Sequence, residues 1–564
     1  MESIFASHME RALLEDSNYA SLMDPEDPLL KNLQSKGFEH EEAFLEQLIK
    51  DGKNVLEIDA NDKSDRQTQT RQAMKNGADI IVQAYLELNE FGGVADFLFK
   101  VPGESTLGDY HYEIWDAKLS KKMKPYFMIQ LCCYAEMLES EQGCKPKNVA
   151  IVHGDRKVSR LKCRDFFNYY SGLKSSFISF QNNWKIDNQP DPAEYTTHGR
   201  WSQYAKNILA ERRHLSLIAN ITKTQIKRLE VVGINTIDDM ANTPLKVASK
   251  LNSDLFQRLK LQAKLQISSE GKAKPDHRIL PHENERCIGL SLLAPHSDSD
   301  IFFDIEGFPY YEGGLEYLWG ATYFDQEGSR QFKDFWGHDS EQEKKAFSDF
   351  VDWAFLRWKN DPSMHIYHYG SYEITALRRL MGRHGIKEYE VDTLLRNEVF
   401  IDLYNVVRNG VLIGEPSYSI KNVERIYRKK RDKEVVSGGD SIVVYEEWRS
   451  HADGLTWETS EILKAIRDYN IDDCNSTQEL AEWLRLQQST HKIEYSRKSD
   501  EEVKIEDEEV TEVTKLREKL LDMALQETDK DKKDILQNLA WLLEFHKREN
   551  KPTWWRLFDR LGLT

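Results

Sequence analysis

Three strand-like runs, rich in apolar residues with polar residues between them, follow one another in the first part of the chain. They are DIIVQAYLEL from residue 79, GVADFLFKV from residue 93 and YHYEIWDAKL from residue 110. Their composition is typical of β-strands, and amphipathic stretches accompany them. The pattern over residues 37 to 155 predicts an α/β domain, to which we assign residues 1–160.

The pattern changes twice farther along the chain. Residues 161–286 have a helical period and form a predicted connector, with two short helices at about 214–250 around VVGINTIDDM. Residues 287–490 again indicate an α/β domain, which opens with the strand SDIFFDIEGF and closes with the helix SEILKAIRDYNIDDCNSTQELAEWLRL. The remainder, 491–564, begins with the acidic linker KSDEEVKIEDEEVTEV and continues as a helix through 547 to an aromatic end.

Composition agrees with several soluble domains. The 564 residues correspond to about three to five domains, and 40% are hydrophobic, which is enough to form cores. No apolar run reaches the roughly 18 to 20 residues of a membrane span, and the N-terminus lacks the apolar stretch of a signal peptide, so we expect a cytoplasmic protein with no membrane partner. Subtracting 95 acidic residues from 77 Lys and Arg leaves a net charge of -18, which argues against nonspecific coating of nucleic acid but allows a local basic cleft.

The first candidate site lies in the N-terminal domain. Asp96 and Asp116 interrupt apolar strand-like runs, where an uncompensated carboxylate is costly to bury. Two carboxylates at adjacent strand ends suit a divalent metal, and Lys118 projects from the same face of the strand as Asp116. Downstream, Gln130 and Tyr134 share one face of a predicted helix.

In order, the motifs G-x-x-H-E, G-x-A-D, D-x-K and Q-x-x-x-Y resemble the RecB-like branch of the PD-(D/E)xK nucleases. The resemblance implies a restriction-endonuclease-like fold with His40, Asp96 and Asp116 as metal ligands and Lys118 as the catalytic lysine. It also implies that Gln130 and Tyr134 form the branch's helix motif near DNA. Iron-sulfur members of that branch carry a cysteine upstream of the core; here the first is Cys132, so we expect no cluster.

The second candidate site lies in the α/β segment after residue 287. Asp304 and Glu306 are two apart on a predicted strand, so both carboxylates leave the same face and suit a shared metal. Glu373 follows where a strand-like run gives way to a helix, and Tyr469 and Asp473 are one helical turn apart. Taken singly, such acids are more often helix caps or members of a solvated face.

The order D-x-E, an acid at a helix start, then Y-x-x-x-D resembles the DEDD exonuclease superfamily, with its RNase H-like fold. In that family the acids bind two metal ions and the tyrosine positions the nucleophile. Glu373 departs from the usual Asp, which puts the metal geometry and the rate in question. Asp402 and Asp472 are alternative acids, and Asp472 is the closer alternative because it is next to Asp473.

Two further features suggest contacts with a nucleic-acid backbone. The connector resembles a helix-hairpin-helix element, whose turn at Gly233 would offer backbone N–H groups to phosphate; an ordinary two-helix spacer is the alternative. Basic runs, namely RIYRKKRDK from Arg425 and Lys118 with Lys121, Lys122 and Lys124, are candidates to follow phosphates, although most such runs are solvated faces.

The whole order of domains resembles a bacterial family of RecB-like nucleases that usually continue into a superfamily I helicase. No G-x-x-x-x-G-K-[ST] occurs in the sequence, so we do not expect ATP-driven unwinding. A truncated reading frame and a standalone form that recruits a helicase in trans both remain open.

The function that these patterns favour is a nuclease dependent on Mg²⁺ or Mn²⁺, with two active sites, acting on nucleic acid in repair or defence, and on DNA rather than RNA. The alternative is a noncatalytic nucleic-acid-binding scaffold or helicase accessory with a degenerate second site.

Overall fold

The computed structural model describes residues 3–26, 28–60, 62–244, 251–281, 287–311, 313–428, 438–496, 512–527, 529–543 and 545. The chain forms two compact units, each made of several segments. The first comprises Met1–Lys264, Gly307–Leu315 and Glu434–Ile466; the second comprises Leu265–Glu306, Glu316–Lys433 and Arg467–Thr564. Both candidate sites fall within single units, the first in unit 1 and the second in unit 2.

Unit 1 contains a six-stranded sheet in the order β1-β2-β3-β4-β5-β6. The strands are β1 Val55–Glu57, β2 Ile80–Leu88, β3 Phe91–Ser105, β4 Gly108–Lys118, β5 Asn148–His153 and β6 Val158–Lys162. The helices around them are α2 Pro28–Lys50, α3 Lys63–Lys75 and α4 Pro125–Gln142, whereas α1 Ile4–Glu15 packs on Trp201 and Ala205 farther along the chain. Strand β4 pairs with β5 in parallel, and α4 makes the crossover between them. The three strand-like runs of the sequence are thus β2, β3 and β4.

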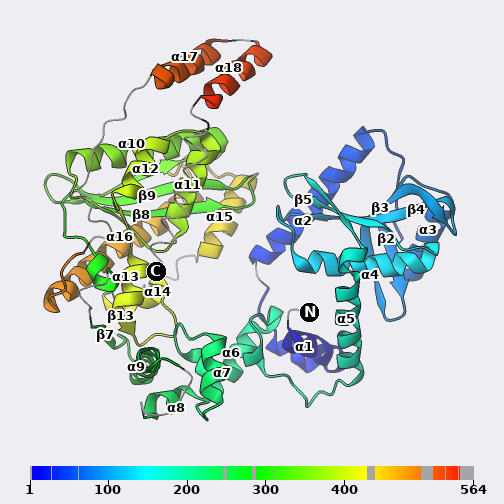
Figure 1. Cartoon of the computed structure of the whole chain (residues 1–564), viewed down its shortest axis with the longest axis horizontal. Coiled ribbons are helices and arrows are strands. Elements are labelled where there is room, and N and C mark those ends of the chain that lie inside the picture. The colour runs from blue at the N-terminus through cyan, green and yellow to red at the C-terminus, as the bar shows by residue number, and fades with distance from the viewer. Residues whose placement is uncertain are drawn as a thin grey trace. The chain divides into compact units, whose positions relative to one another are not determined.

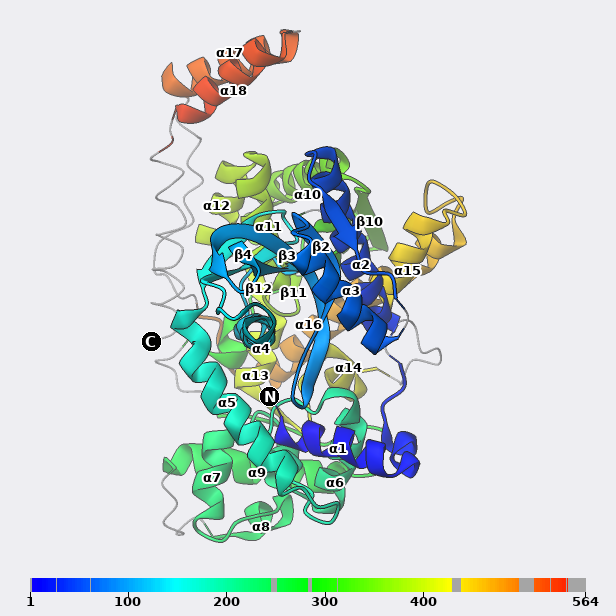
Figure 2. The ribbon, with the colours of Figure 1, turned by 90° about the vertical axis from the view of Figure 1, so that its right-hand side faces the viewer.

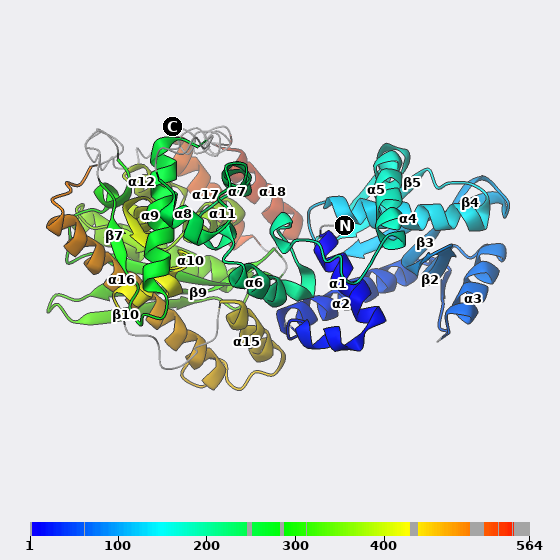
Figure 3. The same ribbon diagram turned by 90° about the horizontal axis from the view of Figure 1, so that it is seen from below.

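Helices α2 and α4 cover opposite faces of this sheet (Figure 3). Leu48 of α2 packs with Ile80 and Phe97, whereas Leu131 of α4 packs with Ile81. In Figure 2, α4 is seen along its axis beside β3 and β4. The alternation of side chains along β2 therefore separates two apolar layers, one under each helix.

The connector predicted over 161–286 contains α5 Arg164–Asn182, α6 Ser202–Glu211, α7 Lys223–Glu230, α8 Ile237–Asn242 and α9 Ser253–Ser269, together with β7 His277–Ile279. Between α7 and α8, Gly233 has φ +81°, a left-handed conformation that favours glycine. Its N–H donates to the carbonyl of Glu230 at 2.9 Å, and the Ile234 N–H donates to Leu229. A phosphate contact at Gly233 stays a prediction, and these two amides are already bonded within the helix cap.

Unit 2 contains a five-stranded sheet in the order β10-β9-β8-β11-β12. Its strands are β8 Ile301–Phe308, β9 Leu315–Phe324, β10 Arg330–Trp336, β11 Ile366–His368 and β12 Phe400–Asp402. Strands β8, β11 and β12 run parallel, and β10 is antiparallel to β9. Of these five strands, β8 comes first in the sequence and lies at the centre of the sheet, with two later strands on each side.

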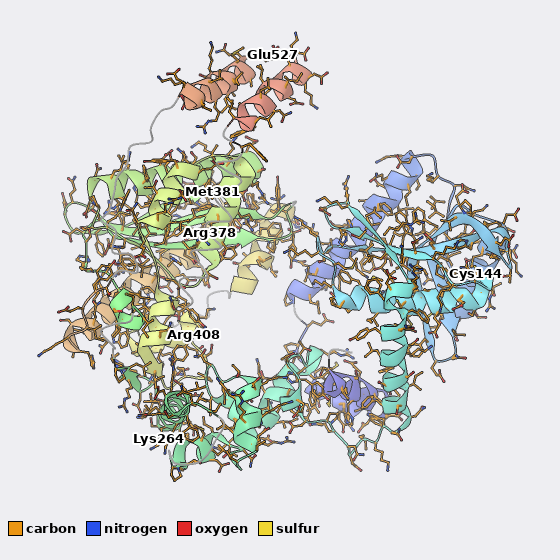
Figure 4. The ribbon with its side chains drawn as sticks, in the orientation of Figure 1. Cys144, Lys264, Arg378, Met381, Arg408 and Glu527 are labelled. Carbon is orange, nitrogen blue, oxygen red and sulfur yellow. The ribbon has the colours of Figure 1, made fainter. Side chains whose placement is uncertain are left out.

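One face of this sheet packs on α10 Ser340–Asn360, α11 Tyr372–His384 and α12 Glu388–Arg396 (Figure 1). Ile301, Phe303 and Ile305 of β8 point into this core, which also includes Met381 of α11, labelled in Figure 4. The long helix α16 Glu461–Thr490 lies at the other face. The remaining elements of this sequence region are α13 Leu403–Gly410, β13 Val411–Ile413, α14 Ile420–Val423 and α15 Gly438–Ser450, the last of which belongs to unit 1.

The C-terminal region differs from the single helix that its sequence predicts. Two helices form, α17 Glu512–Gln526 and α18 Lys530–Leu542, because the Asp529 side chain accepts the N–H groups of Asp531 and Lys532 and starts a new helix. Most of the acidic linker and the aromatic end lie outside the described residues. None of the described helices is long and apolar enough to cross a membrane.

Candidate active sites

Asp96 and Asp116 lie on the neighbouring strands β3 and β4 of unit 1. Asp96 Oδ2 accepts a hydrogen bond of 2.8 Å from the backbone N–H of Ala117, which holds this carboxylate beside Asp116. Asp116 is 1% exposed, and neither of its oxygens receives a well-directed hydrogen bond from the described residues. The Lys118 Nζ lies 2.7 Å from Asp116 Oδ2, so an ion pair offsets part of the cost of burying this carboxylate.

The carboxylates of this site repel one another. Burial raises the pKa of Asp96 to about 8, and the negative charges of Asp116 and Glu41 add to the shift. Burial also raises the pKa of Glu41, which lies near Asp116 as well. Lys118 opposes both shifts but supplies a single positive charge. The cluster therefore favours either a bound proton or an additional cation.

Glu41 is a member of this cluster that the sequence analysis did not select. Its side chain accepts a hydrogen bond from Gln83 and is electrostatically coupled to Asp116. His40, the predicted ligand, instead places Nε2 3.3 Å from the carbonyl of Val152 on β5. A signal was present in the sequence, since Glu41 precedes the buried Leu48 by seven residues and so shares its helix face.

Gln83 marks a break in the sheet next to these acids. Its φ is +55°, a conformation that a non-glycine residue seldom adopts. Ile80 and Val82 face α2, whereas Ala84 and Leu86 face α4, so β2 exchanges its faces at Gln83. This irregularity turns Gln83 toward Glu41, and backbone strain of this kind is concentrated at functional sites.

Helix α4 supports the acidic cluster through Tyr134. The Tyr134 hydroxyl donates to the carbonyl of Val94 at 2.7 Å, two residues before Asp96. A Cβ at Gly93 would lie 3.0 Å from this hydroxyl, so glycine allows the close approach. Burial raises the pKa of Tyr134, and a hydrogen bond with Gln130 acts in the opposite direction. The predicted helix motif is therefore next to the acids and braces the strand that carries Asp96.

The basic loop follows directly from the strand of Asp116. Lys121, Lys122 and Lys124 are all exposed between β4 and α4. Lys124 Nζ lies 5.8 Å from the ring centre of Tyr126. The three lysines can therefore contact a ligand from solution, whereas the acidic cluster beside them is partly buried.

In unit 2, the alternation along β8 divides its side chains between two environments. Ile301, Phe303 and Ile305 enter the core under α10 and α11, so Asp304 and Glu306 lie on the opposite face, where α16 packs. Asn470 of α16 donates to Asp304 Oδ2 at 2.8 Å. One hydrogen bond thus ties the carboxylate of the central strand to this helix.

Gly320 on β9 provides the space for that contact. A Cβ at this position would lie 1.6 Å from Asn470 Oδ1, well inside van der Waals contact. The Cys474 Sγ, one turn farther along α16, donates to the Gly320 carbonyl at 3.3 Å. Because β9 lacks a side chain here, α16 approaches the sheet closely enough to place its polar residues against β8.

Four carboxylates influence one another at this place. Burial raises the pKa of Asp304 well above its ordinary value, and the charges of Glu306, Asp473 and Glu373 contribute in that order. Burial likewise raises the pKa of Tyr469, with Asp473 as the next cause. The residues predicted from three separate motifs are therefore electrostatic neighbours in the fold.

Glu373 has a partner that the sequence analysis did not identify. It lies in the first turn of α11 and is 3% exposed, with Oε2 3.4 Å from Nδ1 of His368 at the end of β11. Burial alone would lower the pKa of His368, but Glu373 raises it overall. The histidine was visible in the sequence five residues before Glu373, at the end of the strand-like run.

The two alternative acids have other contacts. Asp402 Oδ1 accepts the N–H of Gly370 and of Tyr404, each at 2.9 Å, and so caps α13. Asp472 Oδ1 accepts from Arg428 Nη2 at 2.8 Å. Asp473, not Asp472, is the neighbour that raises the pKa of Asp304.

Both clusters offer donors suited to a hard divalent cation. Carboxylate oxygens are the ligands that Mg²⁺ prefers, and oxygens of Asp116 and Glu373 are buried without a well-formed hydrogen bond from the described residues. Within the described ranges, no group of three or more Asp, Glu, His or Cys side chains has the geometry of a metal site. The chemistry of the donors, rather than their geometry, fits a metal.

A family model described as RNase_H superfamily matches residues 301–485. This segment is RNase H-like. It begins with β8 and ends within α16, so it contains the five-stranded sheet and every predicted residue of the second site. Comparisons with curated proteins and with solved structures gave no match. The match confirms the RNase H-like part of the predicted fold.

Proposed function

We propose that the protein is a metal-dependent nuclease that hydrolyses phosphodiester bonds, with DNA as its substrate. The observation that carries this proposal is the group of mutually repelling carboxylates around Asp304 inside the RNase H-like segment. Such a group is costly to maintain without a compensating cation, and it suits chemistry in which divalent cations neutralise the carboxylates and bind the scissile phosphate.

In the RNase H-like site, Asp304, Glu306, Glu373 and Asp473 would hold Mg²⁺ or Mn²⁺. The metal would activate water and stabilise the leaving oxygen. Asn470 orients the Asp304 carboxylate through its 2.8 Å hydrogen bond. Tyr469, next to Asp473, is the residue we assign to positioning the nucleophile. We assign this site to a DEDD-type exonuclease on the resemblance of its motifs.

For unit 1 we propose a RecB-like PD-(D/E)xK site. Its support is the sequence of elements α2, β1, α3, β2, β3, β4, α4 and β5, with the D-x-K motif at the end of β4 and the Q-x-x-x-Y helix hydrogen-bonded to β3. Asp96 and Asp116 would hold the metal. Lys118 would stabilise the charge that develops on the phosphate. Glu41 is better placed than His40 to complete this ligand set, because it is coupled to both aspartates.

The partners we propose are nucleic acid and, for unwinding, a helicase that acts in trans. The exposed Lys121, Lys122 and Lys124 would contact phosphates beside the first site. No iron-sulfur cluster is part of this proposal, and a cytoplasmic location is proposed with it.

One observation favours the alternative for the second site. Glu373 faces His368 within the fold, and a protonated histidine would neutralise this carboxylate without a metal. In that case the RNase H-like domain would bind nucleic acid without cleaving it, and unit 1 would carry the catalysis.

A cleavage assay separates these functions. End-labelled single- and double-stranded DNA and RNA are incubated with Mg²⁺, Mn²⁺ or EDTA, using the wild type, Asp116→Ala, Asp304→Asn and the double variant. Two active sites predict partial loss in each single variant and complete loss in the double variant. Loss of all cleavage in Asp116→Ala alone, with Asp304→Asn unaffected, would favour the noncatalytic second domain. Cleavage that survives in the double variant would refute both assignments.

A further inference from the structure

Lys421 lies at the edge of the second site, although neither family resemblance assigns it a role. It is exposed on α14, and its Nζ lies 6.0 Å from the ring centre of Tyr469. The Ser419 side chain caps this short helix, and Asn422 donates to Glu415 at 2.8 Å. The lysine therefore projects from an anchored turn beside the tyrosine that adjoins Asp473.

The neighbouring cations along this segment are already neutralised. Arg425 pairs with Glu415, and Arg428 pairs with Asp472 and Glu479. Lys421, by contrast, has no carboxylate partner among the residues for which the structure gives a position. Its charge is thus available to an anion from solution.

A tyrosine links this turn to the short segment that precedes α11 and Glu373. The Tyr369 hydroxyl donates to the carbonyl of Tyr418 at 2.6 Å. Tyr369 precedes Glu373 by four residues, and Tyr418 precedes Lys421 by three. This hydrogen bond restrains the position of Lys421 relative to the acids.

Tyr372 supplies an exposed aromatic surface next to the same acids. Its side chain is 49% exposed, yet its hydroxyl donates to Glu316 Oε2 at 2.8 Å. Glu316 is buried on β9 and also pairs with Arg379. Tyr372 directly precedes Glu373 at the start of α11, which places its backbone beside the cluster. The ring is therefore accessible while its hydroxyl end is held.

We infer that Lys421 and Tyr372 form a subsite for the end of a single DNA strand, in which the lysine contacts a phosphate and the tyrosine ring stacks on an unpaired base. The inference rests on the proposed function of this site and specifies its substrate. An unpaired terminal base offers both of its faces and can turn toward an aromatic ring, whereas a blunt duplex offers only the outer face of its paired terminal bases, so the subsite favours single-stranded ends over intact duplex.

Photocrosslinking tests this subsite without requiring cleavage. Full-length protein is irradiated with a single-stranded DNA oligonucleotide whose terminal base is iododeoxyuridine, with Ca²⁺ in place of Mg²⁺ so that the carboxylates carry a cation. Mass spectrometry then locates the crosslink, and its yield is followed against DNA and salt concentration. We expect a crosslink at Tyr372 with the single strand. Its yield should be at least about five-fold lower when a blunt duplex replaces the single strand.

The variants test each contact. Lys421→Ala should lower the slope of log affinity against log salt by about 0.7, the value of one phosphate contact on a single strand. Lys333→Ala is the matched control, since Lys333 also lies over aromatic rings, 5.5 Å from the centre of Phe335, but on β10; it should leave the slope unchanged. Tyr372→Phe should retain the crosslink, because the ring and not the hydroxyl stacks.

The outcomes distinguish this inference from the proposed function. A crosslink at Tyr372 that depends on Lys421, in a protein whose second site cleaves nothing, supports the subsite and removes the catalytic assignment. Cleavage that is lost in Asp304→Asn, without a crosslink at Tyr372, overturns the subsite and leaves the catalysis. An equal crosslink from duplex, or an equal effect of Lys333→Ala and Lys421→Ala, also overturns the inference.

Discussion

Metal binding at the N-terminal site should strengthen steeply with pH because of Asp96. Its pKa of about 8 arises from burial and from the nearby charges of Asp116 and Glu41. At neutral pH the metal-free cluster therefore retains a proton that a metal must displace. The same shift lowers the stability of the metal-free fold as pH rises from about 4 to about 8, because the folded state holds a proton that the unfolded chain has released.

The size of the effect follows from this pKa. With a group that titrates at about 8, roughly nine-tenths of the molecules carry the proton at pH 7, and binding should release about 0.9 proton. Apparent affinity should rise about nine-fold from pH 6 to 7, about five-fold from pH 7 to 8, and less than about two-fold beyond that. The proton belongs to the coupled cluster, so these values describe the site as a whole.

Isothermal titration calorimetry with Mn²⁺, in two buffers of different ionisation enthalpy, measures the released proton directly. The protein carries Asp304→Asn so that the first site dominates. In that background Asp96→Asn should abolish both proton release and tight binding, whereas Asp79→Asn, at an exposed acid directly before β2, should change neither. Metal binding at pH 7 without proton release would refute the argument that burial and like charges control this site.

Three further outcomes are expected. Gly320→Ala should destabilise the protein by about 1–3 kcal/mol in denaturant unfolding, because the new Cβ would meet Asn470; an unchanged midpoint would contradict the close packing of α16. Lys118→Ala should lower kcat of the first site with little change in Mn²⁺ affinity, and a parallel loss of metal binding would make Lys118 a structural residue instead. Combined alanine replacement of Lys121, Lys122 and Lys124 should flatten the salt dependence of DNA binding by about one unit for each phosphate contact that is lost. An unchanged slope would exclude contacts between DNA and this loop.

The local patterns of the chain were enough to place the main strands and the acidic residues on them. The alternation in SDIFFDIEGF predicts a strand with Asp304 and Glu306 on one face, and β8 separates these acids from Ile301 and Phe303. Such periodicity follows from backbone geometry alone, so it can be recognised without knowledge of the partners. The same holds for β4, where Lys118 lies beside Asp116.

Long-range packing decided what local patterns could not. Helix α16 reaches β8 only because Gly320, some 150 residues away along the chain, leaves room for Asn470. The sequence pattern likewise indicated a single C-terminal helix, whereas the side-chain cap of Asp529 divides this region into two helices.

The neighbours of each acid also depend on the tertiary structure. Glu41, next to His40 in the sequence, lies near the first cluster and accepts a hydrogen bond from Gln83, which the break in β2 turns toward it. The sequence does not distinguish Asp472 from Asp473. In the fold, Arg428 pairs with Asp472, whereas Asp473 lies close to Asp304. Electrostatic coupling depends on distance through the fold and not on separation along the chain, so only the tertiary structure determines which carboxylates act together.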